Sequence, residues 1–298
     1  SNIDALLITP PSRLEVYQGL ANDYAAIEPP VWSSLIANFL IKKGFTAEIL
    51  DAEAENLTHE KTAEKIVQKN PKLAVFMVYG QQPSASTQCM PGGKKTCSKL
   101  NEITSNEIKS IVIGTHASAL PKKTLEEEPY TYVCQGEGPL TVIELISFLK
   151  GKTKDLKKVP GLWYLDKDKK VCSNPSAKMF EDLDQNLPGQ AWKLLDMKKY
   201  KAHNWHTFGR LDTIKSYASL QTSLGCPFKC TFCCINAPFE RNTIRFWSPK
   251  HIIEQIKILV EDYKITNIKI PDEMFVLNPK QVTGICDEII NSGYGKVL

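Results

Sequence analysis

The sequence predicts an α/β protein whose parallel sheet is covered by helices on both faces. Short apolar segments, such as residues 5–8, 73–78 and 111–113, alternate with helix-like segments along the first 150 residues. Apolar strands that alternate with helices are typical of a parallel sheet that is buried on both sides. The same alternation returns from about residue 211, which predicts a second α/β unit.

The elements of the first unit can be placed from their apolar periodicity. The predicted strands cover residues 5–8, 46–50, 73–78, 111–113 and 132–134, and the predicted helices cover residues 31–43, 61–69 and 140–150. The helix at residues 31–43 has Val31, Leu35 and Phe39 on one face and ends at Gly44, a residue that commonly terminates helices.

The second half of the chain divides into a connector and another α/β unit. Residues 152–210 are rich in Lys, Asp and Pro, and residues 160–166 resemble a short hairpin strand. Strands at 216–222 and 267–270 and helices at 249–263 and 280–292 follow. Pro249 suits the first position of its helix, with Ser248 as the N-cap. The expected domains are therefore residues 1–151, 152–210 and 211–298.

Composition excludes several classes of protein. The net charge is +4 and the lysines are scattered, so the concentrated basic face of a nucleic-acid-binding protein is absent from the sequence. No apolar run approaches the ~20 residues that a membrane span needs. The first residues lack the basic and apolar segments of a secretory signal, so we expect a cytoplasmic protein.

Cysteines provide the strongest functional signal. Four of the nine cysteines fall within residues 226–234, and clustered thiols outside a small secreted domain indicate metal chemistry. Cys226, Cys230 and Cys233 have the spacing C-x3-C-x2-C directly after a predicted strand, and Cys234 is expected to be structural. Structural zinc and electron-transfer clusters both prefer four protein ligands. Three thiolates therefore favour a [4Fe–4S] cluster with one iron open to a small molecule, and zinc or another metal is the alternative.

The cysteine spacing resembles the signature of the radical S-adenosylmethionine family, with Phe232 as the aromatic residue before the last cysteine. Residues 245–249 also resemble the segment that follows the cluster in this family. The resemblance implies that S-adenosylmethionine binds the open iron and that the reduced cluster cleaves it to a 5′-deoxyadenosyl radical. It also implies that Asp272 or Glu273 holds the amino group of S-adenosylmethionine by charge-assisted hydrogen bonds. Family members often have Gly-Gly-Glu where this chain has Pro-Asp-Glu, so both acids are candidates.

Turns with Gly or Pro follow four predicted strands of the first unit, at the edge where α/β sheets bind ligands. A flavodoxin-like, Rossmann-type sheet before a radical S-adenosylmethionine core resembles the cobalamin-binding subgroup of the family. Residues 114–121 resemble the Gly-Gly-x-His motif of that subgroup, and residues 132–138 resemble its Gly-Glu motif. The predicted cobalamin contacts are Pro10, Pro11, Ser12, Tyr79, Gly80, Gln81, Gly114, Thr115, His116, Gly136, Glu137 and Gly138.

One departure concerns the cobalt ligand. Many cobalamin proteins donate a histidine from an Asp-x-His-x-x-Gly motif, but Thr9-Pro-Pro-Ser-Arg13 stands after the first strand here. We therefore expect the cobalt to lack a histidine from this chain. His116 follows the fourth strand instead, and we expect it to orient a loop or a corrin amide.

The resemblance implies an enzyme similar to the class B methylases, which transfers a methyl group to an unactivated carbon. Cyclisation or rearrangement, and a corrin- or metal-binding module without turnover, are the alternatives. We expect a small-molecule, lipid or peptide substrate and a reductant such as a flavodoxin or ferredoxin. Residues 211–298 would form only the start of the (β/α) partial barrel of the family, so we expect the sequence to be part of a longer protein.

Overall fold

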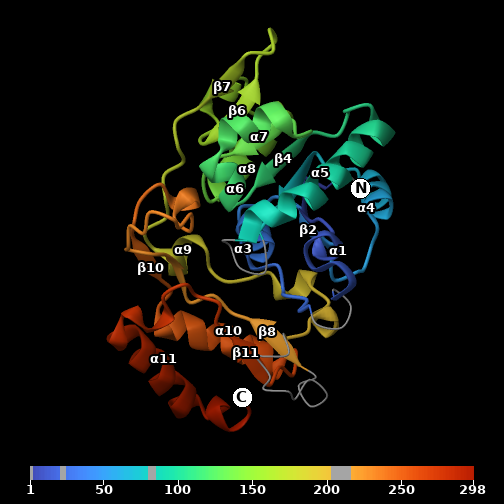
Figure 1. Ribbon diagram of the computed structural model, residues 1–298. Helices are drawn as coiled ribbons and strands as arrows, with labels where there is room; N and C mark the ends of the chain where they lie inside the picture. Colours follow the sequence, from blue (N-terminus) through green and yellow to red (C-terminus); the bar gives the residue numbers. More distant parts are fainter. Residues whose placement is uncertain (1–2, 21–24, 80–84, 203–215) are drawn as a thin grey trace.

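The first half of the chain folds around a seven-stranded sheet, and the predicted α/β class is confirmed. A computed structural model describes residues 3–20, 25–79, 85–202 and 216–298 (Figure 1). The strand order is β2-β1-β3-β4-β5-β6-β7, and its first five strands are parallel. This is the flavodoxin-like order. The parallel strands are β1 (Ala5–Thr9), β2 (Ala47–Asp51), β3 (Leu73–Met77), β4 (Ser110–Ile113) and β5 (Tyr132–Cys134).

Two apolar cores lie on opposite faces of this sheet. Leu7 belongs to the core that includes residues of α3 (Val31–Lys42) and α8 (Pro139–Leu149). Leu6 and Ile8 belong to the core that includes residues of α4 (His59–Lys69) and α5 (Ser86–Thr104). Alternate residues of one strand point to opposite faces, so β1 is buried on both sides. The remaining helices of this half are α1 (Arg13–Tyr17), α6 (Thr115–Ala119) and α7 (Pro121–Glu127).

The longest helix of this half was not predicted. Helix α5 contains Pro91, Gly92 and Gly93, which are residues that destabilise helices by their intrinsic propensity. The glycines allow a close approach instead. A Cβ atom on Gly92 would lie 2.4 Å from the carbonyl oxygen of Pro11, and one on Gly93 would lie 2.4 Å from the hydroxyl of Tyr130. Tertiary packing therefore overrides local propensity in α5.

The sheet also continues past the boundary expected at residue 151. Strands β6 (Leu162–Leu165) and β7 (Val171–Ser173) form a hairpin whose first strand pairs antiparallel with β5. Leu162 and Tyr164 are buried in the core that contains α8, which explains why this hairpin joins the sheet. The Lys- and Asp-rich residues 166–170 form the turn of this hairpin, and residues 167–170 are exposed.

The second half begins with two short pairs of strands. Of the strand expected at 216–222, only β8 (Tyr217–Ser219) forms, and it pairs parallel with β11 (Asn267–Lys269). A separate strand, β9 (Ser223–Gly225), follows after three residues and pairs antiparallel with β10 (Ile244–Phe246). Helices α10 (Pro249–Glu261) and α11 (Pro279–Ser292) pack together. The predicted N-cap is confirmed, because the hydroxyl of Ser248 accepts a hydrogen bond from the backbone N–H of His251 at 3.1 Å.

Residues 187–202 lie between the two halves and bond to both (Figure 1). The N–H of Ala191 donates to the hydroxyl of Ser34 on α3 at 2.7 Å. The indole of the next residue, Trp192, donates to Gln255 on α10 at 2.9 Å. One apolar core accordingly includes residues from both halves. Among the described residues, no helix is both long and apolar enough to cross a bilayer.

Asp51, at the end of β2, is a buried acid at this junction. Its carboxylate accepts hydrogen bonds from the hydroxyl of Tyr200 at 3.0 Å and from the N–H of Ala54 at 3.1 Å. Burial raises the pKa of Asp51 from 3.8 to about 7, although these two hydrogen bonds favour the charged form. Burial favours the protonated, neutral form of a carboxyl group, because the charged form loses its hydration.

We predict that Asp51 makes stability fall as the pH rises. The pKa of Asp51 is higher in the folded state than in the unfolded state. The contribution of Asp51 to the free energy of unfolding is therefore fully present below about pH 4 and is lost as the pH rises through about 7. Asp51→Asn imitates the protonated acid and should raise the free energy of unfolding at pH 8 by about 1–4 kcal/mol. Urea denaturation at about pH 5 and about pH 8 measures this. The exposed Asp168→Asn is the control, and equal pH dependence in Asp51→Asn and the natural chain would contradict the prediction.

Candidate functional site

A cavity of about 140 Å³ lies between the carboxyl ends of the two parallel sheets. β1 and β3 reach it from the first half, and residues following β8 and β11 reach it from the second. Ligands of α/β sheets bind at this edge. The lining residues are Thr9, Ser12, Arg13, Val16, Tyr17, Ala26, Ile27, Glu28, Pro29, Pro30, Val31, Trp32, Ser33, Glu53, Met77, Tyr79, Gln88, Cys89, Ser219, Gln221 and Pro271.

The cavity includes only some of the predicted cobalamin contacts. Ser12 and Tyr79 line it, whereas the turns at 114–116 and 136–138 do not. Gly80 and Gln81 lie outside the described residues. Tyr79 stacks on Trp32, with ring centroids 5.6 Å apart and an angle of 11° between the rings. Tyr79 and Trp32 thus form an aromatic wall on the side of the first half.

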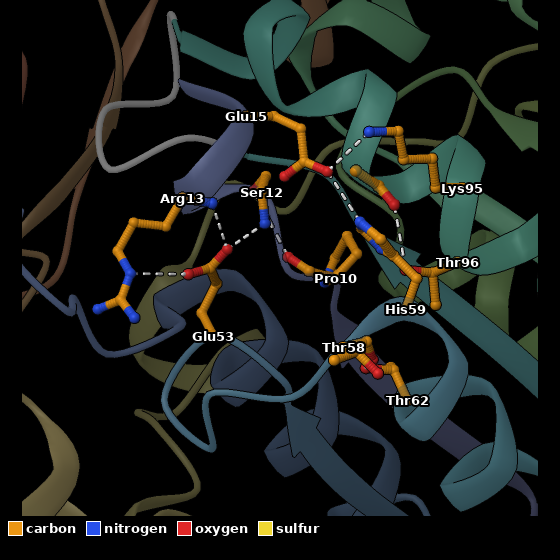
Figure 2. Close-up of polar contacts among 11 residues, drawn as sticks. Pro10, Ser12, Arg13, Glu15, Glu53, Thr58, His59, Thr62, Lys95 and Thr96 are labelled. Atoms are coloured by element: carbon orange, nitrogen blue, oxygen red, sulfur yellow. Dashed lines mark hydrogen bonds and ion pairs between the residues drawn. The ribbon is translucent and has the colours of Figure 1, made fainter. Parts of the chain in front are cut away.

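Helix α1 forms another part of the wall, and two glutamates hold it in place (Figure 2). One oxygen of Glu53 accepts hydrogen bonds from the backbone N–H groups of Ser12 and Arg13, the latter at 2.6 Å. Glu15 lies 2.8 Å from Nε2 of His59, the first residue of α4. The N–H of Ser12 is therefore occupied, and its hydroxyl donates a long hydrogen bond to the carbonyl oxygen of Pro10 at 3.5 Å.

The turn at 114–116 packs against neighbouring segments. A Cβ atom on Gly114 would lie 2.3 Å from the carbonyl oxygen of Val78, so glycine allows this turn to approach β3. Nδ1 of His116 lies 2.9 Å from the hydroxyl of Thr87, and burial lowers the pKa of this histidine. The buried hydroxyl of Thr115 has no hydrogen-bond partner within the described ranges. No histidine is among the described residues that line the cavity.

Glu137, a predicted cobalamin contact, is bonded to Arg245 instead. The two side chains form an ion pair and are 7% and 5% exposed. Arg245 also donates to the carbonyl oxygen of Phe180 at 2.7 Å, and its guanidinium lies 5.3 Å from the ring centroid of Phe239. The pair joins the turn after β5 to β10, the strand that follows the cysteine loop. Because the carboxylate is committed, Glu137 acts as a link between the two halves.

The cysteine loop follows β9, as predicted. Cys226 is buried, whereas Cys230 and Cys233 are exposed, and all three are free thiols. Asn236 holds the base of the loop, because its side chain accepts from the N–H of Cys226 at 3.0 Å and donates to the carbonyl oxygen of Cys226 at 2.7 Å. Phe232 is 91% exposed. An aromatic ring in that position is available to a molecule that binds beside the loop.

The thiols have the chemistry of an iron–sulfur site. Soft thiolates on one short loop suit iron–sulfur clusters. In the described part of the chain, however, no three side chains of His, Cys, Asp or Glu lie close enough together to hold a metal ion. Cys230 and Cys233 are at the surface, where their thiols are accessible.

The structure distinguishes the two candidate acids after β11. Asp272 accepts hydrogen bonds from the N–H of Thr222 at 2.8 Å and the hydroxyl of Ser223 at 2.7 Å. Burial raises the pKa of Asp272, and these hydrogen bonds oppose that shift. Glu273 is exposed, and its pKa is also raised, by partial burial and by the charge of Asp272. Asp272 therefore fixes the strand that leads into the cysteine loop, and Glu273 is the more accessible acid.

Comparison with known proteins agrees with both halves of the structure. Residues 17–146 match the B12 binding domain family. An uncharacterized methyltransferase of Pyrococcus horikoshii is 28% identical over 289 residues, which are 97% of this chain and 57% of that protein. The radical S-adenosylmethionine methyltransferase TsrM of Kitasatospora setae has the same fold, with a TM-score of 0.68 and 17% identity over 98% of this chain and 51% of its own. The first half is thus similar to B12 binding domains, and the whole chain has the fold of solved cobalamin-dependent radical S-adenosylmethionine enzymes.

Two further proteins extend the comparison. The anaerobic magnesium-protoporphyrin IX monomethyl ester cyclase of Cereibacter sphaeroides is 25% identical over 287 residues, which are 93% of this chain and 42% of that protein. The cobalamin-dependent S-adenosylmethionine radical enzyme OxsB has a TM-score of 0.67 and 18% identity over 97% of this chain and 37% of its own. The chain spans about half the length of the curated relatives that it matches.

Sequence reasoning missed three residues that organise the site. Glu28, Asn236 and Arg245 bond to partners that are 10 to 241 positions away in the sequence. Glu28 has a weak local signal, since it is an acid directly before two prolines. Nothing in the local sequence identifies the partners of Arg245, because Glu137 is 108 positions away.

We predict that the Glu137–Arg245 pair is important for stability. Arg245→Ala leaves the buried carboxylate of Glu137 uncompensated, which should lower the free energy of unfolding by about 3–5 kcal/mol. Arg241→Ala is the matched control, because the partner of Arg241, Glu181, is 67% exposed, and its loss should cost about 0–1 kcal/mol. Chemical denaturation of the three proteins tests this, and a similar small effect of both substitutions would show that the pair is not a stabilising link.

Proposed function

We propose that this chain carries the cofactor sites of a radical S-adenosylmethionine enzyme that uses a [4Fe–4S] cluster and cobalamin to methylate an unactivated carbon. One observation carries the proposal. The B12-binding half and the half with the cysteine loop direct their carboxyl edges into one shared cavity. A reaction that needs two cofactors and a substrate requires them to be held together in one place.

The proposed cluster ligands are Cys226, Cys230 and Cys233. The exposed ring of Phe232 and the carboxylate of Glu273 would contact S-adenosylmethionine, and Asp272 would support them by anchoring Thr222 and Ser223. The cluster supplies the electron that cleaves S-adenosylmethionine, and cobalamin supplies the methyl group. The described residues contribute a loop of thiols, an accessible acid beside it and a partly apolar cavity that limits water.

The proposed cobalamin site lies on the first-half side of the cavity. Thr9 and Tyr79 line the cavity and have buried hydroxyls without hydrogen-bond partners among the described residues. Such groups carry a desolvation cost that a hydrogen-bonding ligand can relieve. The stack of Tyr79 on Trp32 gives a flat apolar surface of the kind that suits a macrocycle. The described lining of the cavity contains no histidine that could bind the cobalt.

A second candidate reaction is cyclisation. It is favoured by the 25% identity to a protein named as a cyclase of magnesium-protoporphyrin IX monomethyl ester. We propose a small-molecule, lipid or peptide substrate, a flavodoxin or ferredoxin as reductant and a cytoplasmic location. The product distinguishes the two reactions, since methylation adds one carbon to the substrate and consumes a second molecule of S-adenosylmethionine as methyl donor.

Anaerobic reconstitution of the full-length protein tests the proposed function. The loaded protein should contain about four irons and four sulfides and one cobalt per chain. With a reductant, it should convert S-adenosylmethionine to 5′-deoxyadenosine, and the methylase should also form S-adenosylhomocysteine. Stoichiometric zinc without inorganic sulfide would overturn the cluster assignment, and loaded protein without cobalt would overturn the cobalamin assignment.

We predict that each of Cys226→Ala, Cys230→Ala and Cys233→Ala abolishes the cluster, because two thiolates cannot retain three of its irons. The iron and sulfide contents of each variant should fall to background. The visible absorption that arises from sulfur-to-iron charge transfer should disappear with them. Cys234→Ala and the exposed Cys286→Ala are matched controls that should retain the cluster. Retention of the cluster by any of the three ligand variants, or its loss in Cys234→Ala, would contradict the assignment.

A further inference from the structure

Glu28 connects the two halves of the chain directly at the cavity. It precedes α3 in the first half, and its side chain bonds to β8 and β11 of the second. Oε2 accepts hydrogen bonds from the hydroxyls of Tyr217 and Ser219, both at 2.7 Å. Oε1 accepts a hydrogen bond from the ammonium of Lys269 at 2.9 Å. One carboxylate therefore holds both strands of the β8–β11 pair.

The partners of Glu28 lie on one face of that pair. Tyr217 and Ser219 are two positions apart on β8, so their side chains project from the same face of the strand. Lys269 is the register partner of Ser219 on the parallel strand β11. Glu28 and Ser219 also line the cavity. The contact consequently forms part of the boundary of the cavity between the two sheet edges.

This arrangement favours one fixed geometry. The side chains of Glu28 and Lys269 are 12% and 16% exposed, so separating them would leave two poorly hydrated charges. Both oxygens of Glu28 already have donors, which leaves little capacity to bind a ligand. Three short bonds to two strands constrain the direction and the length of the link. The carboxylate is suited to fixing a distance and not to recognising a substrate.

Two other contacts that help to join the halves do not lie on the cavity wall. Among the described residues, neither member of the Glu137–Arg245 pair lines the cavity, nor do Asp51 and Tyr200. These contacts can hold the halves together without fixing the width of the cavity. Only the Glu28 contact, of these three, combines a charged link with a position on the cavity wall.

We propose that Glu28 is a positioning residue that sets the distance between cobalamin on the first half and the cluster on the second. The inference rests on the proposed function, because it requires both cofactors. A displacement of about 1 Å between reacting groups can reduce a rate about 100-fold, so a fixed distance between the sheet edges has chemical value. Glu28 acts through Tyr217, Ser219 and Lys269 and touches neither cofactor.

The test is a distance measurement in the full-length protein loaded with both cofactors. One-electron reduction gives a paramagnetic cluster, and cobalt(II) in cobalamin is also paramagnetic. Their dipolar coupling, measured by pulsed electron paramagnetic resonance, falls with the cube of their separation. Glu28→Asp keeps the charge but shortens the side chain by one methylene, and Glu28→Gln keeps the length but removes the charge. We expect both to change the coupling or broaden its distribution, with iron and cobalt contents unchanged.

A matched control separates positioning from general stability. Glu48→Gln removes a more exposed ion pair of the first half, whose Glu48–Lys69 distance is 2.6 Å, and should leave the coupling unchanged. Tyr217→Phe and Ser219→Ala each delete one hydroxyl and should change the coupling in the same direction as the Glu28 variants, but less. These two variants decide the question if the Glu28 variants do not fold.

Two negative results have different meanings. If folded, fully loaded Glu28 variants show the same dipolar coupling as the natural protein, Glu28 does not set the distance, and the proposed function stays intact. If the Glu28 variants do not fold, an unchanged coupling in both Tyr217→Phe and Ser219→Ala leads to the same conclusion. A natural protein that binds no cluster or no cobalamin would overturn the proposed function, and the positioning role with it. Thermal melting of the same samples shows whether a changed coupling accompanies a loss of stability.

Discussion

The buried ion pair of Glu137 and Arg245 is the contact on which the arrangement of the two halves depends. It joins the turn after β5 to the strand after the cysteine loop, and Arg245 also bonds to Phe180 in the segment between the halves. Three parts of the chain therefore meet at one guanidinium. A buried charge is tolerated only with well-placed partners, so separating the two halves at this point would be costly.

The cavity is a consequence of that arrangement. Both parallel sheets present their carboxyl ends to it, and its lining combines residues that are more than 200 positions apart. The first half contributes an aromatic wall and hydroxyl groups, whereas the second contributes Ser219, Gln221 and Pro271. Neither half encloses the space alone. The cavity thus depends on both the half that matches the B12 binding domain and the half that carries the cysteine loop.

Local patterns in the sequence predicted much of the fold. The parallel strands of the first half, the N-cap at Ser248 and the position of the cysteine loop follow from apolar periodicity, capping chemistry and spacing. Helix α5 could not be predicted in this way, because Gly92 and Gly93 are explained by close packing against Pro11 and Tyr130. The division of residues 216–222 into a strand and a turn likewise depends on pairing with distant strands.

The side chains of the site were harder to predict than its location. Glu137 stands in a motif-like turn, but its role is decided by an arginine 108 positions away. Asp272 and Glu273 are adjacent in the sequence, and only the hydrogen bonds from Thr222 and Ser223 distinguish them. The exposure of Cys230 and Cys233 beside Cys234 has a further consequence for maturation. If these thiols hold the proposed cluster, air oxidation and cluster assembly would compete for the same sulfur atoms, so the order of the two events would decide whether a newly folded chain becomes competent.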